Sequence, residues 1–145
     1  MSSKATTTKK LFSRQTTVSV DIAASPAKIW QILCDASAYS KWNSTIISIE
    51  GQIGPDQTIK LISTLAPKRT FTLRVKVYEP NSRLVWGDMM GERTFTLTEN
   101  NHQTHFTMTE KIGGPLFPLF SSQIPSFDES FEAFASDLKQ EAESK

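Results

Sequence analysis

The stretch "SPAKIWQILCDASAYSKWNST", residues 25–45, combines a helix start with two tryptophans and a tyrosine. Ser25 can cap the helix, and Pro26 suits its first turn. One face of this helix is apolar, formed by Ile29, Trp30, Ile32 and Leu33. A second, shorter helix is predicted between Asp35 and Trp42. The sequence therefore predicts two short helices whose aromatic side chains cover an apolar surface elsewhere in the chain.

On both sides of this stretch the periodicity is that of β-strands. Before it, "TTVSVDIAA" alternates Val18, Val20 and Ile22 with polar residues from Thr16 onward. After it come six alternating segments, separated by turns that contain Gly, Pro or Asn. Because the connections are short, these segments predict an antiparallel meander. The six segments are TIISIEG (45–51), QTIKLIST (57–64), RTFTLRVKVYE (69–79), SRLVWGD (82–88), RTFTLTEN (93–100) and THFTMTEKI (104–112).

The end of the chain returns to helical periodicity. Its apolar stripe consists of Phe127, Phe131, Phe134 and Leu138. Ser126 and Glu129 form a capping-box pattern, which predicts a helix from about Ser126 to Glu141. The preceding "PLFPLFSSQIP" contains three prolines and predicts a broken lead-in. The apolar face of the sheet needs a cover, and this helix is the obvious one. Trp30, Tyr39 and Trp42 would then close one end.

The helical stretch at 25–43, "RLVWGD" followed by a glycine turn and "TFTL", and "THFTMTEKIGG" appear in an order that resembles a known superfamily. It is the START-like helix-grip superfamily (SRPBCC), in its polyketide cyclase/dehydrase and lipid transport branch. The resemblance covers residues 16–142. It implies an α+β helix-grip fold, in which a seven-stranded curved antiparallel sheet wraps around a long C-terminal helix and two short helices follow strand 1. It also implies an apolar cavity between sheet and helix.

Length and composition limit the organisation of the chain. With 145 residues and 38% hydrophobic content, one core and one domain are expected. The resemblance implies that this is a single START-like domain over 16–145. Residues 1–15 are basic and rich in Ser and Thr, which predicts a disordered tail, although they weakly resemble a transit peptide. The net charge of +1 argues against nucleic acid as a partner. Because no stretch is long and apolar enough for a membrane span, no stable membrane insertion and a cytoplasmic location are expected.

Strand alternation predicts which side chains face the interior. Val77 and Leu84 share this phase, and so does Glu110, which follows Phe106 and Met108 on one strand. A carboxylate facing an apolar interior is a candidate acid or base; alternatively, it lies at the end of the sheet and reaches water. Asp88 has the same ambiguity. The predicted ligand-binding residues are Phe71, Leu73, Val75, Trp86, Phe95, Leu97, Phe106, Met108, Glu110, Phe127 and Phe131.

Sequence motifs for other chemistry are missing. His102 and His105 have no evident metal partners, the single Cys34 forms no cysteine cluster, and no phosphate-binding glycine loop occurs. No metal or cofactor is therefore expected. The resemblance favours binding or transport of a hydrophobic small molecule, such as a lipid, sterol or polyketide-like compound. The alternatives are a polyketide cyclase or dehydratase that uses Glu110, and a protein-interaction domain.

Cavity composition separates these three hypotheses. An apolar cavity would favour binding, and two or more ionisable groups close together in a polar cavity would favour an enzyme. A closed core with an exposed apolar patch would favour the interaction role.

Overall fold

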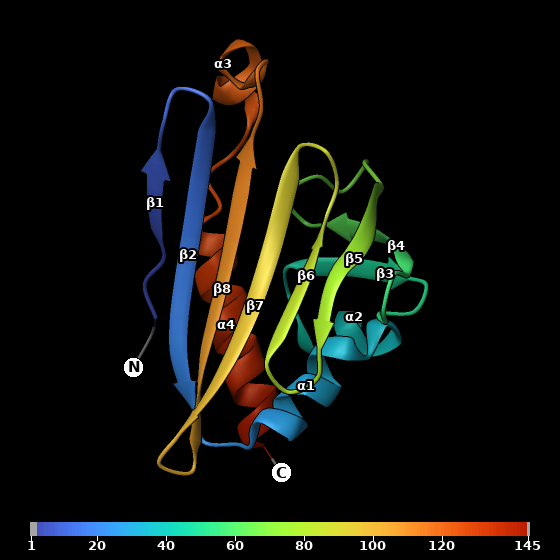
Figure 1. The fold of residues 1–145 in the computed structure, drawn as a ribbon, viewed down its shortest axis with the longest axis vertical. Coiled ribbons are helices and arrows are strands. Elements are labelled where there is room, and N and C mark those ends of the chain that lie inside the picture. The colour runs from blue at the N-terminus through green and yellow to red at the C-terminus, as the bar shows by residue number, and fades with distance from the viewer. Residues whose placement is uncertain (1–2, 145) are drawn as a thin grey trace.

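The strands form one antiparallel sheet, and helix α4 lies across one of its faces (Figure 1). The computed structural model describes residues 3–144. The strand order is β1-β2-β8-β7-β6-β5-β4-β3, so the meander predicted from the sequence is confirmed and β8 pairs back onto β2. The strands are β1 (Thr6–Lys9), β2 (Ser13–Ile22), β3 (Ile46–Glu50), β4 (Thr58–Ser63), β5 (Phe71–Glu79), β6 (Arg83–Gly87), β7 (Gly91–Asn100) and β8 (Gln103–Gly113).

The helices follow the predicted order, with one shift. The Ser25 hydroxyl accepts a hydrogen bond from the Lys28 N–H at 3.2 Å, as expected of a helix cap. The last helix begins two residues later than predicted: Ser126 accepts from the Asp128 N–H at 3.3 Å, and no capping box forms. The helical elements are α1 (Pro26–Cys34), η1 (Ala36–Ala38), α2 (Tyr39–Trp42), α3 (Phe117–Phe120), η2 (Ser121–Gln123) and α4 (Asp128–Glu143).

The start of the chain differs from the prediction of a tail over residues 1–15. Strand β1 makes the sheet eight-stranded, pairing Thr6 with Thr17 and Lys9 with Arg14. The Ala5 N–H donates to the Glu132 carboxylate at 2.8 Å, which links this segment to α4. Hydrogen bonds rather than apolar contacts hold β1 in place. The sequence pattern did not predict this strand, because the prediction relied on apolar content. Met1 and Ser2 lie outside the described residues.

Strand β5 departs from simple alternation. Its pairing with β6 shifts between Val75 and Val77, where a bulge inserts one extra residue. Val75 is 1% exposed in the core, whereas Tyr78 rather than Val77 packs against the core beyond the bulge. The prediction that Val77 faces inward is therefore wrong.

Aromatic residues of the two short helices close one end of the core, as predicted. Tyr39 is fully buried, and its hydroxyl donates to the Leu33 carbonyl at 2.6 Å. The Trp42 ring lies 5.8 Å from the ring of Phe134 on α4. Trp30 meets Tyr78 edge to face at 5.2 Å. These contacts connect α1 and α2 to both α4 and the sheet.

Candidate functional site

Most of the predicted ligand-binding residues lie together between the sheet and α4. Phe71 is the exception: it is partly exposed, and the Arg69 guanidinium lies 4.5 Å above its ring. Leu73 and Phe127 are partly buried and pack against the core. The buried members are Val75, Trp86, Phe95, Leu97, Phe106, Met108 and Phe131.

The buried aromatic rings contact one another. Phe134, which was absent from the predicted ligand-binding set, lies 5.8 Å from Phe95 and 6.5 Å from Phe106, measured between ring centroids. Met108 and Phe134 are at most 1% exposed. In this structure these side chains pack on each other, and neither of the two pockets described below is lined by them. That they contact a ligand stays a prediction.

The main polar feature of this interior is an ion pair. Arg93 on β7 lies directly opposite Glu110 on β8, and its Nε donates to Glu110 Oε1 at 2.7 Å. The two side chains are 16% and 19% exposed. The Arg93 guanidinium also lies 5.0 Å from the Phe131 ring and 5.8 Å from that of Phe134. Glu110 therefore has a charged partner, and the guanidinium of that partner lies against aromatic rings.

The sequence contained a signal for Arg93 that its analysis missed. Arg93 has the same phase as Phe95 and Leu97 in "RTFTL", so strand alternation already placed it on the inward face. What alternation could not show is its pairing with Glu110, because register between strands is a tertiary property.

The ion pair continues into a polar row of four residues, Arg14, Thr16, Arg93 and Glu110. Thr16 pairs with Glu110 across β2 and β8. Arg14 is 7% exposed and donates to the carbonyls of Ile124 and Pro125 at 3.2 and 2.7 Å. Arg14 therefore ties the segment before α4 to the sheet.

Arg14 also contacts an aromatic ring and lies near two carboxylates. Its guanidinium lies 4.9 Å from the Phe127 ring. Burial lowers the pKa of Arg14, and the charges of Asp128 and Glu110 oppose that change. Thr7 donates to Asp128 and lies 3.0 Å from the hydroxyl of Thr16. The polar row is thus continuous with the hydrogen bonds that hold β1.

A solvent pocket reaches one end of the polar row. It has a volume of about 620 Å³ and separates β1 from the segment that precedes α4; we call it the β1 pocket. Arg14 belongs both to the polar row and to this pocket. The remaining walls are Ala5, Thr6, Thr7, Lys9, Ser121, Ser122, Ile124, Ser126 and Asp128. Solvent therefore has access to the row from the β1 side.

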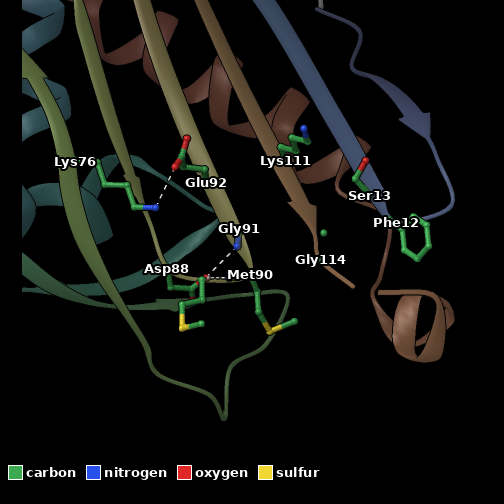
Figure 2. A pocket seen from close by; sticks show the side chains of 11 residues that line it. Phe12, Ser13, Lys76, Asp88, Met90, Gly91, Glu92, Lys111 and Gly114 are labelled. Carbon is green, nitrogen blue, oxygen red and sulfur yellow. Dashed lines mark hydrogen bonds and ion pairs between the residues drawn. The ribbon is translucent and has the colours of Figure 1, made fainter. Parts of the chain in front are cut away.

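A second pocket lies near the turn between β6 and β7 (Figure 2). Its volume is about 600 Å³. Asp88 lines it, and its carboxylate accepts hydrogen bonds from the N–H groups of Met90 and Gly91 at 2.9 and 3.0 Å. Asp88 is thus a turn residue, and the structure does not bring it to the polar row.

The histidines do not contribute to the polar row. His105 Nδ1 lies 2.8 Å from Asp21 Oδ1 at an exposed position. His102 is exposed at the turn before β8. Among residues 3–144, no three His, Cys, Asp or Glu side chains gather in a way that could hold a metal ion.

Two buried donors are unsatisfied within the described residues. They are Nε1 of Trp42 and Nδ2 of Asn43. Asn43 is 3% exposed, and its amide oxygen accepts from both the N–H and the hydroxyl of Thr45, at 2.9 and 2.7 Å. Buried donors usually have a partner, so an acceptor from water or a bound molecule would satisfy these two.

Comparison with solved structures supports the helix-grip architecture. A conserved protein of unknown function from Enterococcus faecalis has a TM-score of 0.69 at 21% identity, over 94% of this chain and 75% of that one. A START superfamily protein from Mycobacterium smegmatis has a TM-score of 0.66 at 18% identity, over 90% and 97%. Another Mycobacterium smegmatis protein has a TM-score of 0.69 at 12% identity, over 98% of both chains. These TM-scores show a shared fold at low sequence identity.

Sequence comparison defines the family. No curated protein matches the chain. Within residues 3–144, no helix has the length and apolar character needed to cross a membrane. The family model described as polyketide cyclase / dehydrase and lipid transport matches residues 13–143, from the start of β2 to the end of α4. The chain therefore belongs to the polyketide cyclase/dehydrase and lipid transport family of START-like (SRPBCC) proteins.

Proposed function

We propose that this protein binds a hydrophobic small molecule that carries at least one polar group. The apolar part would lie among the aromatic side chains under α4, and the polar group would meet Arg93 and Glu110. The observation that carries this proposal is the ion pair on an otherwise aromatic face. A partly buried charge pair costs desolvation that apolar residues of similar size avoid. Such groups are concentrated at functional sites.

The ion pair has unused hydrogen-bonding capacity. Within residues 3–144, Arg93 donates only through Nε, and Glu110 accepts only through Oε1. The two Nη atoms of Arg93 can therefore donate to a ligand carbonyl or carboxylate. Glu110 Oε2 can accept from a ligand hydroxyl. The pair thus suits lipid, sterol or polyketide-like molecules that combine an apolar body with an oxygen function.

The aromatic rings fill the interior, as the protein-interaction alternative expects, so binding of a ligand requires movement. The segment 114–127 contains the short elements α3 and η2 and forms one wall of the β1 pocket, where the polar row meets solvent. Arg14 holds it through two carbonyl groups. Displacing this segment breaks few backbone hydrogen bonds of the sheet, so it is the least costly route to the interior.

A cyclase or dehydratase is the second candidate. The observation that favours it is the close approach of two ionisable groups in the polar row. Glu110 would accept a proton from the substrate, and Arg93 would stabilise the developing oxyanion. Binding and catalysis would therefore use the same pair of residues.

Native mass spectrometry of the purified full chain tests the binding proposal first, because a co-purified lipid or polyketide identifies the ligand class. Titration with the apolar fluorescent probe N-phenyl-1-naphthylamine follows. Wild type should bind the probe, whereas Met108→Trp should bind it poorly because the larger ring occupies ligand space. Met108→Leu, which conserves volume, is the matched control and should bind normally. If wild type neither carries a molecule nor binds the probe, the proposal is wrong.

Glu110→Gln separates binding from catalysis. In a binding protein, this variant should change probe affinity modestly, because the amide oxygen still accepts hydrogen bonds. In an enzyme, turnover of the molecule identified by mass spectrometry should be largely lost, since the amide cannot accept a proton.

A further inference from the structure

Exposed apolar side chains are concentrated at one end of the sheet. Among the side chains whose exposure the structure describes, eight large apolar ones are exposed, and two of them, Ile47 on β3 and Leu65 after β4, lie at the edge of the sheet opposite β1. The other six occupy the turn between β1 and β2, the turn between β6 and β7, and the segment after β8, which meet at the top of Figure 1. We call these six the apolar tip: Leu11 (70% exposed), Phe12 (53%), Met89 (100%), Met90 (42%), Leu116 (64%) and Leu119 (77%).

Hydrogen bonds hold the three loops of the apolar tip together. The Gly113 N–H donates to the Met90 carbonyl at 2.9 Å, and the Gly114 N–H donates to the Phe12 carbonyl at 3.0 Å. Figure 2 shows Phe12 and Met90 on opposite sides of Gly114. A Cβ at Gly113 would lie 2.4 Å from the Phe12 carbonyl oxygen, so this close approach requires glycine. The tip is therefore one connected surface.

Positive charge accompanies the apolar tip. Lys9, Lys10 and Lys111 are exposed at this end and make no ion pair among residues 3–144. The nearby acids are engaged: Glu92 pairs with Lys76 at 3.0 Å, and Asp88 accepts two backbone N–H groups. Three cations without partners thus adjoin six exposed apolar side chains.

We propose that the apolar tip docks on the surface of an anionic lipid bilayer. Protruding apolar side chains beside lysines match the two layers of such a surface, the acyl boundary and the phosphate headgroups. A protein partner is less suited, because protein interfaces are depleted in lysine, whereas Lys9, Lys10 and Lys111 adjoin the exposed apolar side chains. This docking is peripheral and goes beyond the proposed ligand binding, on which it does not depend.

Co-sedimentation of the full chain with vesicles tests the proposal. Vesicles of phosphatidylcholine mixed with phosphatidylglycerol are compared with vesicles of phosphatidylcholine alone. Wild type should bind the anionic vesicles more tightly, and added salt should weaken this binding. The triple variant Leu11→Ser/Met89→Ser/Leu119→Ser should bind about tenfold more weakly or not at all. Lys9→Gln/Lys10→Gln/Lys111→Gln should lose the preference for anionic vesicles.

The control variant is Ile47→Ser/Leu65→Ser, which removes exposed apolar groups away from the apolar tip and should bind like wild type. Because every substituted side chain is exposed, all variants should retain the wild-type melting temperature closely. Wild type that ignores both kinds of vesicle would overturn the proposal. So would equal binding by the tip and control variants. Analytical ultracentrifugation measures whether a second copy of the chain binds to the apolar tip instead. A dimer that is lost only in the tip variant, together with no vesicle binding, would overturn the proposal and assign this surface to a second copy.

Discussion

Arg93 and Glu110 face each other across β7 and β8, joined by a 2.7 Å hydrogen bond from Nε to Oε1. Their position depends on strand register, because a slip of one residue would turn one partner to the opposite face of the sheet. The pair therefore reports on the correct pairing of β7 with β8 as well as on the candidate site.

Breaking the pair from one side should destabilise the protein. Glu110→Leu leaves the Arg93 guanidinium without its partner against aromatic rings, and we expect a loss of about 1–3 kcal/mol in the free energy of unfolding. The double variant Arg93→Met/Glu110→Leu should be more stable than the sum of the two single changes predicts, since no charge is left unpaired. Urea denaturation of all four proteins measures this. Additive effects would show that the two side chains are not energetically coupled.

Arg14 should control the mobility of the segment before α4. Arg14→Lys cannot reproduce two guanidinium hydrogen bonds to the carbonyls of Ile124 and Pro125, so amides in residues 121–127 should exchange faster with deuterium. Exchange in the core strands should change little. Arg69→Lys, which replaces another arginine stacked on a phenylalanine, is the matched control and should leave residues 121–127 unaffected. Unchanged exchange in Arg14→Lys would mean that other contacts hold the segment.

Strand β1 should contribute to stability despite its polar composition. Deleting residues 1–9 removes its pairing with β2 and its hydrogen bonds to Glu132 and Asp128 on α4. We expect a loss of about 2 kcal/mol or more in unfolding free energy, and about 1 kcal/mol for Thr7→Val, which removes the hydroxyl contacts with Asp128 and Thr16 but keeps the backbone pairing. Thermal and urea unfolding measure both. A truncated protein as stable as wild type would show that β1 is not held in solution.

Alkaline pH should destabilise the protein through Cys34 and Tyr39. Burial raises the pKa of Cys34 from 9.0 to about 11 and that of Tyr39 well above its ordinary value. Between pH 9 and 11 the folded state keeps a Cys34 proton that the unfolded chain releases, so stability falls as pH rises. Melting temperatures across this range should decline, and less steeply in Cys34→Ala. An identical decline in that variant would remove Cys34 from the explanation.

Thiol chemistry gives an independent measurement of the same group. The raised pKa of Cys34 lowers the fraction of its thiolate near neutral pH. Alkylation by iodoacetamide should therefore be slow in the folded protein and fast in urea. Equal rates in both conditions would contradict the partly buried position of Cys34.

Local pattern was sufficient to predict most elements of the fold. Alternation in "RTFTL" and "THFTMTE" predicted buried Phe95, Phe106 and Met108, and the Ser25-Pro26 start predicted α1, because side-chain period and capping depend on neighbouring residues alone. The same reasoning misplaced the start of α4 by two residues, since helix ends depend on which cap finally forms.

The features that only the tertiary structure decided are contacts between residues distant in the chain. The residues that hold β1, Glu132 and Asp128, are more than 120 residues away in sequence. The β5 bulge, which turned Tyr78 inward in place of Val77, arises in the pairing with β6. The sequence by itself placed Glu110 in phase with an apolar face and left open whether it reaches water at the end of the sheet; strand register decided that Arg93 meets it there. Period is a property of one strand, whereas contact requires two strands to be aligned.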